Sequence, residues 1–165
     1  MIIKTQFTTI PDSYAKKSTE RIDGCPVKSF PFQIIDIPVG AKYLAFTLID
    51  HDAIPVAGFS WIHWSVTDFE VTNNFISIPE NFSRLTQLAQ GKNSQISKFI
   101  GKTNPEVTQR YTGPQPPNED HWYTLTVYAL LEPTKLEDGF YLNELYHAIA
   151  DKVVAKVQVN LLGKY

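Results

Sequence analysis

Residues Tyr43-Leu-Ala-Phe-Thr-Leu-Ile49 form an almost continuously apolar segment. Successive side chains on a strand point to opposite faces of a sheet, so a strand that is apolar at every position has both faces covered. Pro38-Val39-Gly40 provides turn residues immediately before the segment. These residues therefore predict a β-strand that is covered on both faces.

Further strand patterns lie before and after this segment. Residues 122–131 alternate between an apolar side that begins with Tyr123 and a second side that carries threonines and aromatic residues. Residues 153–161 alternate in the same way between apolar and polar positions. Two shorter segments with strand-forming composition are residues 7–10 and 61–66.

Helical patterns are few. One apolar face at helical spacing is predicted near the carboxyl terminus by Leu142, Leu145, Tyr146, Ile149 and Val153. A weaker helical pattern covers residues 83–88. Residues 90–118 are rich in Gly, Asn, Ser and Pro and indicate a long connection, of a kind that is often functional. The predicted class is mostly β with a few helices, one of them near the carboxyl terminus.

Length and composition indicate one domain that spans residues 1–165. A chain of 165 residues is close to the common size of a single domain, and it contains neither an internal repeat nor a linker. Its composition, 43% hydrophobic and 19% charged, is that of an ordinary globular protein. Cys25 is the only cysteine, so the chain cannot depend on an internal disulfide.

The charge and hydropathy of the chain argue against several classes of partner. The net charge is −2, and no basic run is present, so we expect no nucleic-acid partner. No segment approaches the roughly 20 apolar residues of a membrane span. The first residues lack the apolar stretch of a secretory signal, so we expect a cytoplasmic location.

A first group of candidate site residues follows the apolar strand. Asp50 closes this strand and Asp52 lies two residues later, so both carboxylates can lean to one side. His63 lies in the next predicted strand, between aromatic residues. Each also has an ordinary structural explanation, because aspartates after strands are often turn residues and a histidine among aromatic residues is often a hydrogen-bonded core residue.

A second group of candidates lies at the start of the 122–131 strand. The segment Tyr111-Thr-Gly-Pro-Gln-Pro-Pro117 is a stiff loop that leads to His121 and Tyr123. Histidine is the side chain whose charge is most easily set by its surroundings near neutral pH. Prolines in a loop by themselves indicate only stiffness. The residue pattern alone therefore indicates a β-rich domain with a candidate His/Asp pocket.

The order of these motifs resembles the phosphatidylethanolamine-binding protein family. The first group resembles the family's D-P-D-A-P, G and H-W motif, and the second resembles its Y-x-G-P-x-P-P and H-x-Y motif. Gln90-Gly91 with Asn93 is similar to a short Q-G-x-N element of prokaryotic members. The tail from Ala155 to Tyr165 is similar to their closing A-x-x-x-L-x-G-x-Y. The resemblance covers nearly the whole chain.

This resemblance implies a fold and a site. The implied fold is a β-sandwich with a larger antiparallel central sheet and a few peripheral helices. The implied site is a small pocket for phosphate, a phospholipid headgroup or a phosphorylated ligand, with no cofactor and no metal. The prokaryotic branch is similar to Raf-kinase-inhibitor-like proteins. Carried over by position, the pocket residues are Asp50, Asp52, His63, Gly113, Gln115, His121 and Tyr123.

Three positions depart from the family motifs. His51 stands where the first motif has a proline, and Ile54 is inserted before its second proline, so we expect a reshaped turn. Gln115 stands where relatives tend to carry Gly or Cys. Its side-chain amide can narrow the pocket or donate a hydrogen bond to the ligand.

We interpret the two aspartates as partners of the histidines and not of the anion. A neighbouring carboxylate raises the pKa of a histidine because it favours the charged ring. It also fixes which ring nitrogen carries the outward N–H. On this hypothesis His63 and His121 donate charge-assisted hydrogen bonds to the anion. Backbone N–H groups near Gly113 would add further donors.

Three other functions are weighed against anion binding. A hydrolase would need a nucleophile, but no G-x-S-x-G sequence occurs and Cys25 has no base that the sequence can place, so we expect no enzyme. Two histidines and a carboxylate can also form a metal site. A protein-interaction module, acting as a protease or kinase inhibitor, would use the same pocket to dock a phosphorylated or carboxylate-bearing segment.

Overall fold

The computed structural model describes residues 1–165 and consists mainly of antiparallel β-strands with few helices. The strands form a four-stranded sheet in the order β6-β5-β8-β9, a three-stranded sheet in the order β1-β4-β7 and a two-stranded hairpin. The strands are β1 (Ile2–Lys4), β2 (Arg21–Ile22), β3 (Cys25–Pro26), β4 (Phe32–Ile35), β5 (Tyr43–Asp50), β6 (Trp61–Glu70), β7 (Phe75–Ile78), β8 (His121–Leu130) and β9 (Val153–Gly163). The helices are α1 (Ile54–Ala57), α2 (Phe82–Leu85), α3 (Pro105–Thr108) and α4 (Leu142–Ile149), with single 3₁₀ turns at Asp12–Tyr14 and Ser94–Ile96.

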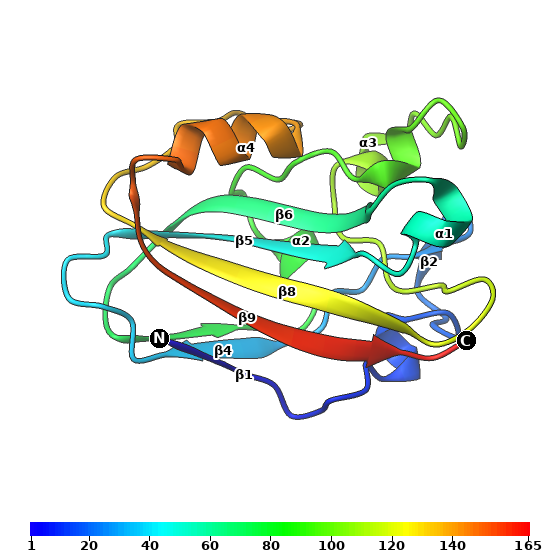
Figure 1. Cartoon of the computed structure of the whole chain (residues 1–165), viewed down its shortest axis with the longest axis horizontal. Helices are drawn as coiled ribbons and strands as arrows, with labels where there is room; N and C mark the ends of the chain where they lie inside the picture. The colour runs from blue at the N-terminus through cyan, green and yellow to red at the C-terminus, as the bar shows by residue number, and fades with distance from the viewer.

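Strand β5 lies inside the larger sheet and is buried from Leu44 to Asp50. On one face, Leu44, Phe46 and Leu48 contribute to the main core between the two larger sheets. On the other face, Ala45 packs in a smaller core under α4, which covers the outside of the sheet (Figure 1). The prediction of a strand covered on both faces is confirmed, because a second sheet and a helix flank it.

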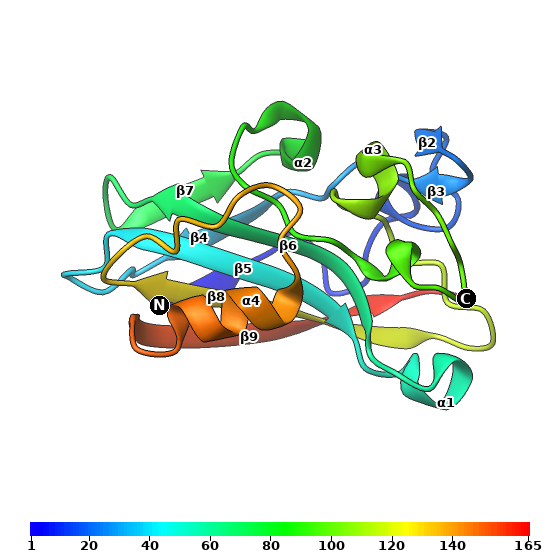
Figure 2. The same cartoon turned by 90° about the horizontal axis from the view of Figure 1, so that it is seen from above.

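The main core is rich in aromatic rings. The small sheet lies against one face of the large sheet and α4 lies on the opposite face (Figure 2). Between the sheets, Phe46 contacts Trp64 edge to face with ring centroids 4.9 Å apart, and it contacts Phe32 in the same manner at 5.4 Å. Such pairs stabilise a fold by about 0.5–1.5 kcal/mol each beyond the burial of their area.

Helix α4 is shorter than its apolar pattern predicts. The helix begins at Leu142, where the Glu144 carboxylate accepts a hydrogen bond from the backbone N–H of Tyr141 at 2.6 Å. It ends at Ile149, and Val153 instead pairs with Leu130 as the first residue of β9. Val153 fits both the helical pattern and the alternating pattern of β9. It belongs to the strand because pairing with β8 extends the sheet.

Two other predicted elements differ from the structure. Residues 7–10 do not form a strand, although the N–H of Ile10 donates to the carbonyl of Leu162 at 2.8 Å. The weak helix expected at 83–88 is α2, which is one turn long and begins at Phe82. The long connection over 90–118 contains α3 and the 3₁₀ turn at 94–96. None of the helices has the length and apolar character that a membrane crossing requires.

Antiparallel pairing brings the end of β5 beside the beginnings of β6 and β8. Asp50, the last residue of β5, lies opposite Trp61 on one side and Tyr123 on the other. Helix α1, the hairpin of β2 and β3, and the loop before β8 gather at this end of the large sheet (Figure 1, right). The two groups of candidate residues therefore meet at one end of the molecule.

Candidate ligand-binding site

A cavity of about 340 Å³ opens at the end of the large sheet where β5 ends. Its floor comes from β5, β6 and β8. Its walls come from α1 and from the 90–118 connection, the last part of which is the loop that precedes β8. Six of the seven predicted site residues line this cavity, namely Asp50, His63, Gly113, Gln115, His121 and Tyr123.

The structure places the seventh predicted residue, Asp52, outside the cavity. Its exposed carboxylate accepts a hydrogen bond from the backbone N–H of Trp122 at 2.7 Å. Asp52 and Trp122 line a separate shallow hollow on the outside of the sheet. The expectation that both aspartates share the pocket is therefore wrong, because Asp52 ties the turn after β5 to the outer side of β8.

A β-bulge places His63 on the cavity wall. Ile49 pairs with Ile62 and Leu48 pairs with Trp64, so His63 is an extra residue in β6. An extra residue breaks the strict alternation of a strand and re-aims a side chain. His63 therefore lines the cavity while its neighbour Trp64 packs in the main core.

Hydrogen bonds to Thr112 fix the ring of His63. The Nδ1 atom lies 2.7 Å from the carbonyl oxygen of Thr112, which can only accept, so Nδ1 carries the proton. The backbone N–H of Thr112 donates in turn to the carbonyl of His63 at 3.1 Å. No carboxylate contacts this ring, and burial lowers the pKa of His63 below 6.5 against the opposing effects of Thr112 and Asp50. This result corrects the hypothesis of a charged His63, because loss of hydration outweighs the distant carboxylate.

The lowered pKa of His63 predicts a loss of stability in acid. Above pH 6.5 the His63 ring is neutral in both the folded and the unfolded chain. Below pH 6.5 the ring becomes protonated in the unfolded chain but stays neutral in the folded protein until the pH reaches its lower pKa. The free energy of unfolding should therefore fall as the pH drops from 6.5 towards the folded-state pKa. Urea denaturation between pH 7.5 and 5 measures this slope. His63→Gln should flatten it, and an equal slope in the variant would contradict the assignment.

His121 and Asp50 form a buried pair. Nδ1 of His121 lies 2.8 Å from Oδ2 of Asp50, and the two residues are only 1% and 3% exposed. The other ring nitrogen, Nε2, lies 3.0 Å from Oδ1 of Asn118. Oδ1 of Asp50 accepts from the N–H of Ala53 at 3.0 Å. The carboxylate thus faces a histidine as expected, but Asn118 occupies the ring nitrogen that was expected to meet the anion.

Tyr123 lies between the two histidines in the cavity wall. Its ring meets that of His63 edge to face, with centroids 5.0 Å apart. Burial, followed by the negative charge of Asp50, raises the pKa of Tyr123 well above its usual value. The phenol therefore stays protonated over the whole physiological range and keeps its O–H as a donor.

Gly113 is required for packing and does not supply a free donor. Its N–H donates to the carbonyl of Pro26 at 2.9 Å, so the expected backbone donor is already used. A side chain at this position would overlap the carbonyl oxygen of Tyr14 and touch Cβ of Pro26. The glycine allows the loop before β8 to lie directly against the amino-terminal segment.

Gln115 is held by an arginine from the hairpin of β2 and β3. Nη2 of Arg21 donates to Oε1 of Gln115 at 2.5 Å. Because the amide oxygen is engaged, the amide nitrogen of Gln115 remains a donor without a partner in the protein. This arrangement favours the donor role that was predicted for the unusual glutamine.

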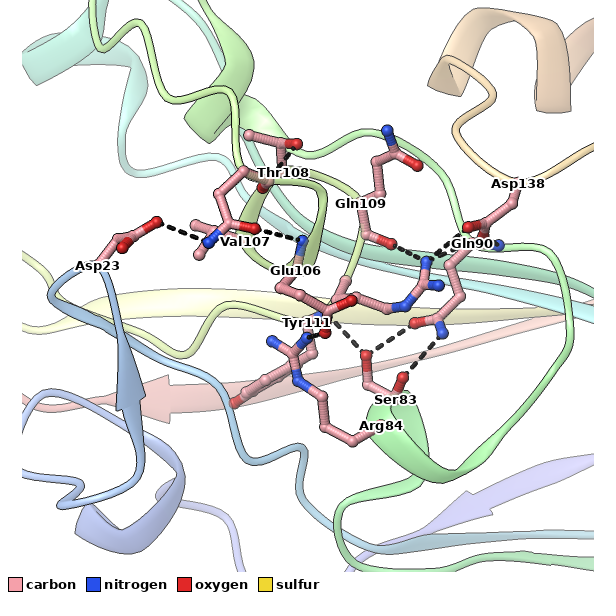
Figure 3. A network of polar contacts seen from close by, with 12 residues as sticks. Asp23, Ser83, Arg84, Gln90, Glu106, Val107, Thr108, Gln109, Tyr111 and Asp138 are labelled. Atoms are coloured by element: carbon pink, nitrogen blue, oxygen red, sulfur yellow. Dashed lines mark hydrogen bonds and ion pairs between the residues drawn. The ribbon is translucent and has the colours of Figure 1, made fainter.

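The Q-G-x-N element contacts the start of the cavity loop (residues 111–117), and Figure 3 shows its Gln90 beside Ser83 and Tyr111. The side-chain oxygen of Gln90 accepts from Nε1 of Trp64 at 2.8 Å and from Oγ of Ser83 at 2.7 Å. Oγ of Ser83 accepts in turn from the N–H of Tyr111 at 2.9 Å, and Asn93 donates to the carbonyls of Val107 and Arg110. This network joins the aromatic strand to the start of the cavity loop.

The inserted residue Ile54 begins α1. Pro55 lies in the first turn of this helix, where its missing N–H costs nothing. Val56 and Ala57 line the cavity, whereas His51 is exposed and bonds Ser60 at 2.8 Å between Nδ1 and Oγ. The turn is therefore a single helical turn that adds apolar surface to the cavity.

Several residues of the site were not predicted, and three of them carry a polar group or an aromatic ring. Trp61 and Gln95 line the cavity, and Asn118 bonds His121. Trp61 lies two residues before His63 in the same strand, which could have indicated it. Gln95 and Asn118 carry no such signal, because they lie in the irregular connection whose path depends on tertiary contacts.

The sequence model of the family described as "Phosphatidylethanolamine-binding protein" matches residues 4–163. The chain belongs to this family. Among curated relatives, it is 46% identical to the uncharacterized protein YxkA of Bacillus subtilis over 157 residues, which cover 93% of this chain and 92% of YxkA. It is 28% identical to a UPF0098 protein of Chlamydia pneumoniae, over 82% of this chain and 80% of that protein.

Solved structures of family members share the fold. The putative phosphatidylethanolamine-binding protein homolog CT736 of Chlamydia trachomatis superposes with a TM-score of 0.75 at 24% identity, covering 99% of this chain and 95% of CT736. Escherichia coli YbcL superposes with a TM-score of 0.73 at 19% identity, covering 99% and 94%. At these identities the likeness concerns the fold alone, and it confirms the predicted family fold with its larger antiparallel sheet.

Proposed function

We propose that the cavity binds a small anion, either phosphate or the phosphate of a headgroup or other phosphorylated ligand. The observation that carries the proposal is a set of hydrogen-bond donors that line the cavity without partners in the protein. They are the side-chain amides of Gln95 and Gln115. The volume of about 340 Å³ is at the lower end of the range of small-molecule sites.

Each polar group of the cavity has a distinct role in this proposal. The amides of Gln95 and Gln115 donate to phosphate oxygens, and the phenol of Tyr123 donates once it turns away from the carboxylate of Asp50. Neutral His63 has Nε2 free as an acceptor, so it suits a protonated phosphate oxygen. His121 donates only after Asn118 moves away from Nε2. This scheme replaces the predicted pair of charged imidazoles.

The cavity contains only some of the side-chain types that can take part in catalysis. Its lining contains no Ser, Thr, Cys or Lys that could act as a nucleophile. Cys25 is buried in β3. No group of three His, Cys, Asp or Glu side chains in the protein is arranged to hold a metal ion. The reactive groups that do line the cavity are Asp50, His63, His121 and Tyr123.

Titration with inorganic phosphate tests the proposal. We expect saturable changes in the NMR spectrum of the ¹⁵N-labelled protein at the end of the large sheet, with a dissociation constant in the millimolar range, about −4 kcal/mol. Tyr123→Phe should weaken binding several-fold because it removes one donor, about 1 kcal/mol. Asp52→Ala lies outside the cavity and should leave the affinity unchanged. Equal shifts with chloride, or no saturation, would exclude a phosphate site.

A protein partner is the second candidate, because apolar side chains are exposed beside the cavity. Ile54, Val56 and Ile100 are each about half exposed, and Phe99 is 73% exposed. Surface groups of this kind, next to a polar pocket, suit a segment that carries an anion and an apolar residue. On this reading the protein is an inhibitor or interaction module. A pull-down that compares wild type with His121→Ala would reveal partners that depend on the cavity.

A further inference from the structure

The source of positive charge for an anion, which presupposes the proposed anion site, does not lie in the cavity wall. Within the cavity, the carboxylate of Asp50 lies against His121, so a charge on that ring is matched by the carboxylate. The N–H of His63 is used by Thr112. The cavity wall itself therefore offers an anion neither net positive charge nor a free imidazole N–H.

Two cations stand at the edge of the cavity, on the amino-terminal segment. Nη2 of Arg21 donates to Oε1 of the cavity residue Gln115. Nζ of Lys16 donates to the carbonyl oxygen of Pro116, which also lines the cavity, at 3.3 Å. Both cations thus contact the residues of the cavity loop from outside.

Neither cation is neutralised by a carboxylate. The guanidinium of Arg21 bonds only neutral oxygens, namely the carbonyls of Lys16, Ser18 and Gly24 and the amide of Gln115. The ammonium of Lys16 has its carbonyl partner and lies 4.1 Å from the centre of the Tyr165 ring. Of the thirteen other Lys and Arg side chains, five form ion pairs with carboxylates, namely Lys17, Lys28, Arg84, Arg110 and Lys164.

We propose that Arg21 and Lys16 form a cationic rim that supplies the positive charge for the anionic ligand of the cavity. Neutral acceptors hold both side chains in place without cancelling their charge, so the rim is positioned before the ligand arrives. Arg21 also acts through Gln115. Its hydrogen bond to the amide oxygen orients the side chain so that the amide nitrogen is free to donate to the ligand.

Charge-removing variants and inorganic phosphate test the rim. The affinity of wild type, Arg21→Gln, Lys16→Gln and the double variant is measured by NMR titration at pH 7. We expect each single change to weaken binding about fivefold, as removal of one charge near a surface site should, and the double variant to lose more. The wild-type affinity should fall with added sodium chloride, and the double variant should lose most of this salt dependence.

Three further variants separate charge from structure. Lys42→Gln removes an exposed lysine at the opposite end of β5, where no ion pair holds it, and should leave the affinity unchanged. Arg21→Lys should retain most of the affinity because the charge remains. Gln115→Ala removes the contact but keeps the arginine, and it should lose less of the salt dependence than Arg21→Gln.

The outcomes distinguish the rim from the site. Phosphate binding that is unchanged in the double variant would overturn the rim and leave the anion site intact. Equal losses in Arg21→Lys and Arg21→Gln would also overturn it, because the guanidinium contact and not the charge would then matter. A folded wild-type protein that binds no phosphate would overturn the proposed function, and the rim with it.

Discussion

Asp50→Ala is expected to lower the free energy of unfolding by about 3–5 kcal/mol, the usual cost of removing one partner of a buried ion pair. Asp50 and His121 are both almost fully buried and lie 2.8 Å apart between Oδ2 and Nδ1. The substitution also deprives the N–H of Ala53 of its acceptor. The change therefore leaves two buried donors without partners, namely Nδ1 of His121 and the backbone N–H of Ala53. Urea denaturation at pH 7 measures the loss.

Asp52→Ala is the matched control for this experiment. Asp52 lies two residues later and is exposed, and its carboxylate accepts a single backbone N–H. Its loss should cost only about 1 kcal/mol. A double-mutant cycle of Asp50→Ala with His121→Phe should also show a coupling energy of about 1–3 kcal/mol. Additive effects, or equal losses for Asp50→Ala and Asp52→Ala, would refute the buried pair.

Gly113→Ala is expected to destabilise the protein by about 3 kcal/mol and to weaken phosphate binding. A methyl group at this position overlaps the carbonyl oxygen of Tyr14 and touches Pro26, and backbone atoms cannot yield as a flexible side chain can. The cavity loop would have to move away from the amino-terminal segment. Thermal unfolding and the phosphate titration measure the two effects.

Gly24→Ala separates this clash from the general effect of replacing glycine. Gly24 has φ +78° and open space around its Cα, so an added methyl group meets no atom. The left-handed backbone alone should cost about 1 kcal/mol. If both variants lose the same stability, the close approach of Gly113 to Tyr14 is not a constraint on the loop.

The strands of the large sheet could be predicted from the sequence because their side-chain patterns are local. The apolar run of β5 indicates burial on both faces, and the alternations of β8 and β9 indicate two different faces. Each pattern extends over enough residues to identify a strand. Residues 7–10 could not be judged in this way. Their composition suits a strand, but only Leu162 is available there to pair with them.

The candidate site, too, was predicted only in part from the sequence. Asp50, His121 and Tyr123 were assigned to one pocket through the family resemblance, and the pairing of β5 with β8 brings them together. Asp52 was placed wrongly, since a separation of two residues implies a shared side only while a strand continues, and β5 ends at Asp50. The low pKa of His63 was missed because burial is a property of the whole fold.

The sequence by itself determined the family, the mostly β class and six of the fourteen residues that line the cavity, because motif order and side-chain periodicity are properties of the linear chain. Only the tertiary structure decided that His63 is an extra residue in its strand, that Asn118 covers His121, and that the hairpin of β2 and β3 sets Arg21 beside Gln115. Arg21 and Gln115, for example, are 94 positions apart in the chain. These features depend on register, burial and chain path, which no local pattern of residues encodes.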